Sequence, residues 1–252
     1  GAIVLQDLRM QDMIELLRNQ PIVARAGARV WSGLAGNVGV PKHSTGVSVG
    51  WKNETGSSDS SDAGFGLLML TQHRLTGTTS WTLELIMQTS LDVEAFARED
   101  MMQALAVARD LAAINGSGNA GQPLGISNTT GINSVTFGGA ITFGKLVDAE
   151  TSVLAANVLG TVFAYISTTT TRGKAKQTLE ASAAGARWIW QDDRVNGYPG
   201  FHTQQVPSNK VIFGHMPDLI LADWDGIVVT LDEVTRKKEG IIEVTMHMWA
   251  DN

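Results

Sequence analysis

Two glycine-rich segments match sequence motifs that have a chemical role in other proteins. Residues 116–121 match GxGxxG, whose glycines follow a strand and let a dinucleotide pyrophosphate meet the N-terminus of the next helix. Here Gly116, Gly118 and Gly121 follow a helical pattern, and Pro123 comes next without a further helical run. Because the required context is absent, we interpret the segment as the exit from a helix and expect no bound cofactor.

Residues 46–50 match GxSxG, the nucleophile elbow of many hydrolases. That elbow needs a sharp turn from a strand into a helix, which presents the serine at the top of a sheet. In this chain Ser48 lies inside an alternating, strand-like stretch that leads into no helix. We therefore interpret Ser48 as a polar position of a strand rather than as a nucleophile.

Candidate metal ligands and acid–base groups are scattered along the chain. The five histidines are His43, His73, His202, His215 and His247. None has the HxH or HxxxH spacing that puts two ligands on one element, and Asp59 and Asp62 lack the ligand density of a calcium loop. Cysteine is absent, which excludes disulfides and thiolate zinc sites. We therefore predict no catalytic, cofactor-binding or metal-ligating residues and no enzymatic activity, although a metal site assembled from distant residues stays an open alternative.

Composition narrows the class of protein further. Hydrophobic residues make up 43% and charged residues 17% of the 252 residues, which is typical of a globular chain. We find neither an apolar run of the roughly 18 residues that span a bilayer nor a signal-peptide pattern. The net charge is −6, and the only tight basic cluster, residues 236–238, is interpreted as a solvated loop. This balance argues against a sequence-specific DNA reader.

The element that dominates the chain is a long helix predicted over residues 91–115. Its apolar positions follow the i, i+3, i+4 spacing of one helical face. They are Val93, Phe96, Ala97, Met101, Ala104, Leu105, Ala108, Leu111 and Ala112. At 1.5 Å per residue, about 25 residues make a rod of nearly 40 Å. Asn115 and Gly116 supply a stop through a left-handed C-cap, and we expect Ala104, Ala108 and Ala112 to line a closely packed buried face.

A long hairpin is predicted before this helix. Residues 45–52 alternate apolar and polar side chains, residues 55–64 are small and polar, and residues 65–75 return as a strand. An isolated hairpin is marginal in water. We therefore expect it to lie on a neighbouring subunit.

Shorter elements complete the prediction. Helices are expected over residues 5–19, over 142–158, and from N-caps at 168–171 to about Ala183. Residues 22–31 are expected to be extended. Strands are expected over 162–167, 186–190, 200–206, 210–214, 218–222, 226–231 and 240–249. Trp188 and Trp190 should share one side of a strand, either in the core or in a subunit contact.

The order of several short motifs resembles the tailed-phage major capsid proteins of the HK97-like fold. After the predicted helix, Gln122-Pro123-Leu124-Gly125-Ile126 follows Asn-Gly-Ser-Gly. The other matching motifs are Gly36-Asn37-Val38, Val40-Pro41, Trp51, Glu54, Phe65, Glu84-Leu85, Gln88-Thr89-Ser90, Gln205-Val206-Pro207, Phe213-Gly214 and Trp224-Asp225-Gly226-Ile227. Each motif is weak alone, but together they cover nearly the whole chain in the family's order.

The resemblance implies an α+β, HK97-like capsid fold with four parts. They are an N-terminal arm (1–30), an E-loop (43–80), a P-domain (31–42, 81–126 with a spine helix at 91–115, and 231–252) and an A-domain (127–230). Some family members join a lysine at the E-loop tip to a neighbouring subunit. Residues 55–64 contain no lysine, and Lys52 lies near the loop root, so we expect no such crosslink here.

The resemblance also implies a function. The chain is expected to be a major capsid protein that self-assembles, as hexamers and pentamers, into an icosahedral shell around double-stranded phage DNA. Expected partners are that DNA, contacted non-specifically, with portal protein, scaffold, maturation protease and possible decoration protein, and no membrane. Assembly is expected in the host bacterial cytoplasm and the final location is the virion. Gly1 fits either a protease-made terminus or an arbitrary start. Alternatives are an encapsulin-type protein nanocompartment and, more distantly, a soluble enzyme.

Overall fold

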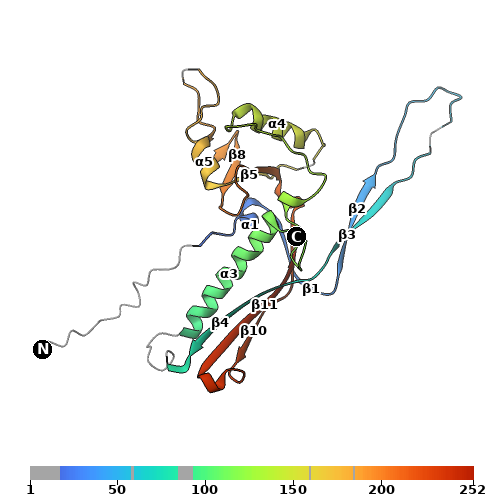
Figure 1. Cartoon of the computed structure of the whole chain (residues 1–252). Helices are drawn as coiled ribbons and strands as arrows, with labels where there is room; N and C mark the ends of the chain where they lie inside the picture. Colours follow the sequence, from blue (N-terminus) through green and yellow to red (C-terminus); the bar gives the residue numbers. More distant parts are fainter. Residues whose placement is uncertain (1–17, 58–59, 85–92, 159, 184) are drawn as a thin grey trace.

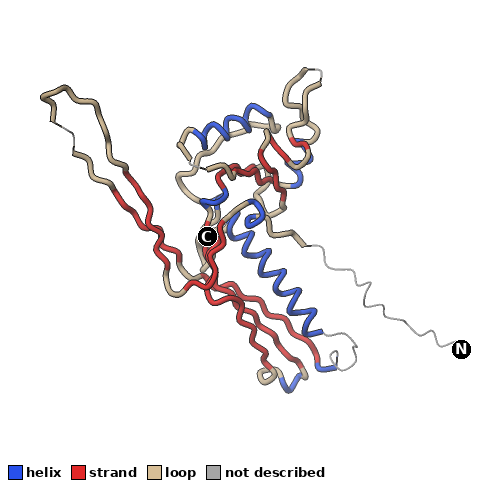
Figure 2. Tube along the Cα trace, turned by 180° about the vertical axis from the view of Figure 1, so that it is seen from behind, coloured by secondary structure: helices blue, strands red, loops and turns tan. Residues whose placement is uncertain are grey.

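The computed structural model describes residues 18–57, 60–84, 93–158, 160–183 and 185–252. The helix expected over residues 5–19 therefore lies almost wholly outside the described residues. Three parts are visible: an upper domain, a lower sheet with one long helix along it, and a hairpin that projects away from both (Figures 1 and 2). The α+β class expected from the sequence is confirmed.

The long helix is α3, Val93–Asn115, close to the predicted 91–115. Its lower half buries Met101 and Leu105 against Val244 and Met246 of the sheet. Its last turn buries Ala113 and Ile114 in a central core that also contains Val23, Ala26, Ala164, Ile166, Val206, Met216 and Leu221. The helix therefore joins the lower sheet to the upper domain.

The predicted buried face of α3 is partly wrong. Ala97, Met101, Leu105 and Ala112 are buried as expected, whereas Ala104 is exposed and Ala108 is half-buried. Phe96 and Leu111 are also exposed. The sheet covers the lower half of the helix from one side only, the side of Ala97, Met101 and Leu105. Ala104 precedes Leu105 by one residue, which is about 100° around the helix axis, and therefore points away from the sheet.

The end of α3 needs glycine for a reason other than a left-handed cap. Gly116 continues the helical pattern by donating its N–H to the Ala112 carbonyl at 2.8 Å, and its φ is not positive. A Cβ on Gly116 would lie 2.2 Å from the Pro123 carbonyl oxygen, and one on Gly125 would lie 2.3 Å from the Gly116 nitrogen. The glycines let the chain fold back tightly on the helix end, where Ser117 and Leu124 form a β-bridge.

The lower sheet has the strand order β1-β10-β11-β4. β1 (Arg29–Leu34) runs parallel to β10 (Ile220–Asp232), and β11 (Ile241–Asp251) lies antiparallel between β10 and β4 (His73–Thr82). Two strands, 218–222 and 226–231, were expected where β10 is a single strand. Asp225 and Gly226, both with positive φ, form a bulge in the ladder instead of a turn between strands.

The projecting hairpin consists of β2 (Val38–Thr45) and β3 (Gly64–Leu70). The expected strand at 45–52 is wrong, because residues beyond Thr45 have no strand partner in the chain. The expected strand at 65–75 is divided between β3 and β4. Between them, Thr71 donates its N–H to Asp251 at 2.7 Å, and the chain then turns to pair with β11.

The upper domain is built on a sheet of order β6-β7-β8-β5-β9. The strands are β5 (Phe163–Ser167), β6 (Trp190–Gln191), β7 (Arg194–Val195), β8 (Tyr198–His202) and β9 (Val211–His215). α4 (Phe143–Leu154) buries Leu146 against Tyr165 of the fully buried β5. The 142–158 helix and the 162–167 strand are therefore confirmed, with the helix shorter than expected.

Two other expected elements differ. α5 spans Thr169–Ala175 and has the predicted N-cap, since Thr168 accepts the Thr171 N–H, but it does not reach Ala183. Residues 22–31 are not wholly extended, because α1 (Val23–Ala26) makes one helical turn before β1. Three short 3₁₀ turns complete the described chain: η2 (Ile126–Asn128), η3 (Met216–Asp218) and η4 (Lys237–Glu239).

Candidate assembly surfaces

The β2–β3 hairpin projects away from the rest of the molecule (Figures 1 and 2), and it exposes apolar side chains on both of its faces. Phe65 is 76% exposed, and the adjacent Leu67 and Leu68, which point to opposite faces, are both exposed. A two-stranded ribbon with no covered face has no core of its own. The hairpin therefore offers surface that another molecule must cover.

The segment leading to the hairpin tip carries the same pattern without a strand. Val49 and Trp51 are 95% and 105% exposed, and Val47 is also exposed. The Ser48 N–H donates to the Ser61 hydroxyl at 2.8 Å across the tip. The alternation that predicted a strand here is thus present in the sequence but has no backbone partner within the described chain.

The hairpin is held firmly at its base. Leu70 and Trp224 are buried together, and the Trp224 indole N–H donates to the Gly36 carbonyl at 2.6 Å. Because Trp224 belongs to β10, this contact ties the start of β2 to the lower sheet.

A second exposed surface is the open edge of β10. β1 pairs with β10 only as far as Trp224, so residues 227–231 pair with β11 on one side and have no described strand on the other. Ile227, Val228, Val229 and Leu231 are exposed and uncharged. Natural proteins usually blunt such edges with charges, proline or a cover. This edge is suited to pairing with another chain.

The first described residues are fastened along α3. Arg18 pairs with Asp100 at 2.6 Å, and Asp110 Oδ1 accepts the N–H groups of Ile22 and Val23 at 3.0 and 2.8 Å. Burial raises the pKa of Asp110 above its ordinary value, against the lowering effect of these backbone hydrogen bonds. Asp110 therefore starts the α1 turn, which explains why residues 22–31 are not wholly extended.

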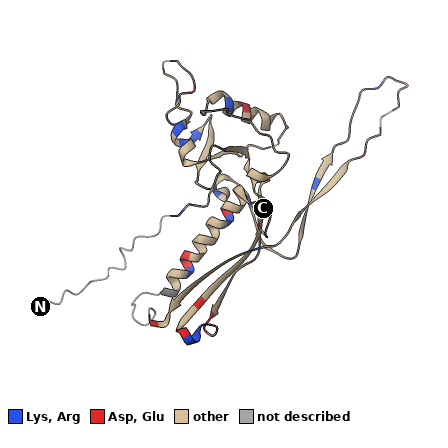
Figure 3. Cartoon of the chain, viewed as in Figure 1, with Lys and Arg blue, Asp and Glu red and all other residues tan. Residues whose placement is uncertain are grey.

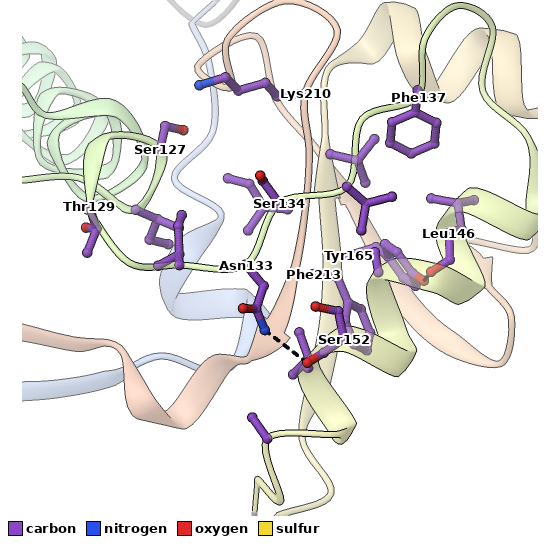
Figure 4. Close-up of a pocket in the computed structure, with 18 of the residues that line it drawn as sticks. Ser127, Thr129, Asn133, Ser134, Phe137, Leu146, Ser152, Tyr165, Lys210 and Phe213 are labelled. Carbon is purple, nitrogen blue, oxygen red and sulfur yellow. Dashed lines mark hydrogen bonds between the residues drawn. The ribbon is translucent and has the colours of Figure 1, made fainter. Parts of the chain in front are cut away.

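The upper domain contains an apolar pocket of about 830 Å³ on its α4 side. It lies between α4, the strands β5 and β9, and the irregular segment after η2 (Figure 4). Ile132, Phe137, Val153 and Phe213 are among its lining residues, and Lys210 is the one charged side chain among the described residues that line it. Asn133 donates to the Ser152 carbonyl at 3.0 Å and holds the irregular segment against α4.

Elsewhere in the upper domain, residues 178–180 and 187–189 pair in a hairpin-like arrangement. Glu180 donates its N–H to the Arg187 carbonyl at 2.9 Å, and Leu179 bridges to Trp188. The expectation that Trp188 and Trp190 share one side is wrong, because Trp188 is 46% exposed and Trp190 is 3% exposed. β6 begins only at Trp190, which packs against Gly200, and the chain turns between the two tryptophans.

Basic residues gather around His202 in the upper domain, where Figure 3 shows Lys and Arg near α5 and α1. Burial lowers the pKa of His202, and the nearby charges of Arg172, Lys176 and Arg25 lower it further. Arg172 also pairs with Asp193 at 2.6 Å. Sequence reasoning missed this basic surface because its members come from separate segments. The predicted cluster at 236–238 is partly neutralised, since Arg236 contacts Glu239 and Glu243.

The chemical motifs considered from the sequence lie in ordinary structural positions. The 116–121 segment makes the turn at the end of α3, and Ser48 lies on the approach to the hairpin tip. The histidines lie on five different strands: β2, β4, β8, β9 and β11. In the part of the chain that the structure describes, no group of three or more His, Cys, Asp or Glu side chains could hold a metal ion. None of the described helices is both long and apolar enough to cross a membrane.

Comparison with known proteins identifies the family of this chain. The model of the Phage capsid family matches residues 1–249, nearly the whole chain. The chain belongs to the phage capsid family. This is a family of structural proteins rather than of enzymes.

Two curated relatives of this capsid-family chain carry the name "Major capsid protein". The one from Halomonas phage phiHAP-1 is 31% identical over 243 residues, which cover 96% of this chain and 40% of the relative. The one from Klebsiella oxytoca phage phiKO2 is 27% identical over 126 residues, which cover 50% of this chain and 29% of the relative. The chain thus spans less than half the length of the curated relatives it matches.

Solved structures share the fold of this capsid-family chain at low sequence identity. The capsid of a native GTA particle, computed with C5 symmetry, gives a TM-score of 0.78 at 18% identity and covers 98% of this chain and 91% of that chain. A chain from Mycobacterium phage Ogopogo gives 0.74 at 14% identity and covers 94% and 89%. These likenesses confirm the HK97-like fold expected from the sequence motifs.

Proposed function

We propose that copies of this chain assemble into an icosahedral shell that encloses double-stranded phage DNA. The observation that carries the proposal is the β2–β3 hairpin, whose exposed apolar faces need a neighbouring molecule. The names of the two curated relatives support the same function. Nothing described in the chain favours an encapsulin-type compartment or a soluble enzyme.

The proposed shell function assigns a role to each part of the molecule. The N-terminal arm is residues 1–28, the P-domain is α3 with the lower sheet, and the A-domain is residues 127–219, since β1 from Arg29 and β10 from Ile220 belong to the lower sheet. Because β4 pairs with β11 of the lower sheet, we assign the E-loop to the β2–β3 hairpin and end it at Leu70 rather than at residue 80. The E-loop then lies on an adjacent subunit, and the A-domain lies at the centre of a hexamer or pentamer.

The proposed partners follow from the shell. They are other copies of the chain, packaged DNA, and during assembly a portal protein, a scaffold and a maturation protease, with a decoration protein as a further candidate. The basic surface around His202 supports a weak, non-specific contact with DNA phosphates. Assembly would take place in the host bacterial cytoplasm, and the finished protein would reside in the virion.

Electron microscopy and gel filtration of the expressed chain test the proposal. We expect closed particles or capsomer rings that elute far ahead of a 26.9 kDa monomer. A monomer that forms no assembly at any concentration, salt or added scaffold would count against the shell. Closed particles that co-purify with one fixed protein cargo would favour the encapsulin alternative.

A further inference from the structure

A second cavity, of about 650 Å³, lies in the upper domain beside the end of β8, and we call it the basic cavity. Its lining is mostly polar, in contrast to the apolar pocket beside α4. The lining side chains that carry charge, or gain it on protonation, are Arg18, Arg25, Asp193 and His202. Arg172 in α5 and Lys176 directly after it add two further cations near His202.

The fold brings these cations together from separate segments. In the sheet of the upper domain, His202 pairs with Ser167, the last residue of β5, and the chain passes from there almost directly into α5, which carries Arg172. The α1 turn, which carries Arg25, packs into the central core together with Phe201, the neighbour of His202 in β8. Figure 3 shows Lys and Arg near both α5 and α1. Sheet register and core packing therefore determine where the positive charge gathers.

Positive charge exceeds negative charge at the basic cavity. Arg18 and Arg172 each contact a carboxylate at 2.6 Å, so these two charges are balanced. Arg25 and Lys176 are exposed, and neither forms an ion pair within the described part of the chain. Burial and the nearby cations lower the pKa of His202, which keeps its imidazole neutral at neutral pH. An anion bound here would meet uncompensated positive charge and would favour protonation of His202.

The lining indicates which anion fits. Phosphate oxygens accept hydrogen bonds from Arg, Lys and side-chain amides, and Asn19, Gln20 and Gln204 supply amides to this lining. Phe201 is the one Phe, Tyr or Trp among the described residues that line the cavity, and it packs against the central core. It therefore offers no free ring on which a base could stack. The lining suits the backbone of a DNA duplex better than the bases of a single strand.

We propose that the basic cavity holds a backbone phosphate group of packaged duplex DNA, with Arg25 and Lys176 as its main charge partners. The inference rests on the proposed shell function and names the part of the molecule that faces the DNA. One such contact is weak, but every copy in a shell repeats it. Because phosphates carry no sequence information, the DNA is held without sequence preference.

Binding of a labelled short DNA duplex to the whole chain, before it assembles into closed particles, tests the site by fluorescence anisotropy. Arg25→Gln combined with Lys176→Gln should weaken binding about tenfold at low salt. The slope of log K against log salt concentration should become shallower by about 2. Lys237→Gln combined with Lys238→Gln, in η4, removes the same net charge and should change binding little. All four positions are exposed, so both double variants should fold.

The pH dependence of duplex binding gives a second readout. A phosphodiester keeps one negative charge at neutral and mildly acidic pH, and the charged groups near His202 (Arg172, Asp193, Lys176 and Arg25) do not titrate there either. A bound phosphate stabilises the protonated imidazole, so affinity should rise as the pH falls from about 7 to about 5. His202→Gln should flatten this rise. Equal pH profiles for the two proteins would overturn the placement of the phosphate beside His202.

Three outcomes separate the remaining explanations. Inorganic phosphate that binds as tightly as the duplex and displaces it would assign the cavity to free phosphate instead of DNA. Added duplex should not bind closed, empty particles, and binding to them would overturn the contact with packaged DNA. Unchanged duplex binding by the Arg25 and Lys176 double variant would overturn the site and leave the shell function standing. Failure of the unmodified chain to assemble would instead overturn the shell function, whatever the duplex measurement shows.

Discussion

Asp110 shows how a single buried carboxylate determines local structure. Replacing Asp110 with alanine removes the acceptor for the Ile22 and Val23 N–H groups. We expect this variant to lose about 1–2 kcal/mol of unfolding free energy. Asp110→Asn keeps an acceptor oxygen and should lose less. Denaturant titration at neutral pH measures both, and equal losses would contradict the assigned role.

The same residue gives a pH dependence with a definite sign. Burial raises the pKa of Asp110 above its ordinary 3.8, so above that pH the folded chain retains a proton that the unfolded chain has released. Stability from this group is therefore fully present below pH 3.8 and falls as pH rises through the folded pKa. Asp110→Asn does not titrate and should show a flatter profile between about pH 3.5 and 7. Parallel stability profiles for the unmodified chain and Asp110→Asn would contradict a raised pKa of Asp110.

Tyr165 joins β5 to α4 through a buried hydrogen bond. Its hydroxyl donates to Glu150 at 2.5 Å, Asn196 donates to the other Glu150 oxygen at 2.7 Å, and burial beside this carboxylate raises the Tyr165 pKa. Tyr165→Phe leaves Glu150 short of a donor and should cost about 1–3 kcal/mol. Tyr198→Phe, in the same aromatic cluster, is the control and should cost less in thermal unfolding.

At the scale of elements, the helix α3 has a revised packing face. Ala113 is fully buried in the central core, whereas Ala104 on the same helix is exposed. Ala113→Leu should overpack the core and cost about 1–3 kcal/mol, and Ala104→Leu should leave the stability of the single chain nearly unchanged. Ala108→Leu, at a half-buried position, should fall between them. Thermal melts of the three variants test this order.

The tip of the hairpin can be deleted while its buried base is kept. Deleting residues 55–64 removes the tip together with Gly64, the first residue of β3, and the buried contacts of the upper domain do not involve it. We expect normal folding of the upper domain and reduced thermal stability of assembled particles. Deleted particles as stable as the unmodified ones would show that the tip makes no useful contact with a neighbour.

The elements that could be predicted are those whose sequence pattern and packing agree. α3 and α4 followed from helical periodicity and β5 from a short apolar run, because the chain itself covers one face of each helix and both faces of β5. The strand predicted over residues 45–52 is wrong, because these alternating residues have no strand partner within the described chain. The single strand β10 was predicted as two strands, because an Asp-Gly pair is typical of a turn and of a β-bulge alike. The hydrogen bonds of Asp110 to Ile22 and Val23 could not be predicted from the sequence pattern, since these residues lie 88 and 87 positions from Asp110.

At the scale of the whole molecule, the absence of lysine in the hairpin tip leads to a prediction about finished particles. Residues 55–64 contain no lysine that could form an isopeptide bond to a neighbour. Boiling assembled particles in SDS should therefore release one band at the 26.9 kDa monomer. A ladder of covalent dimers to hexamers without added crosslinker would contradict this.

The strand order of the lower sheet has a consequence for how the protein is made. β11 follows every other strand along the chain, yet it lies between β10 and β4. On the ribosome, β4 must wait without a partner until β11 has emerged, and pairings so distant in sequence form slowly. A chain interrupted before β11 would leave Met101 and Leu105 of α3 uncovered. Such fragments would lack the finished lower sheet, so on the proposed shell function only fully translated copies would be competent to join a growing particle.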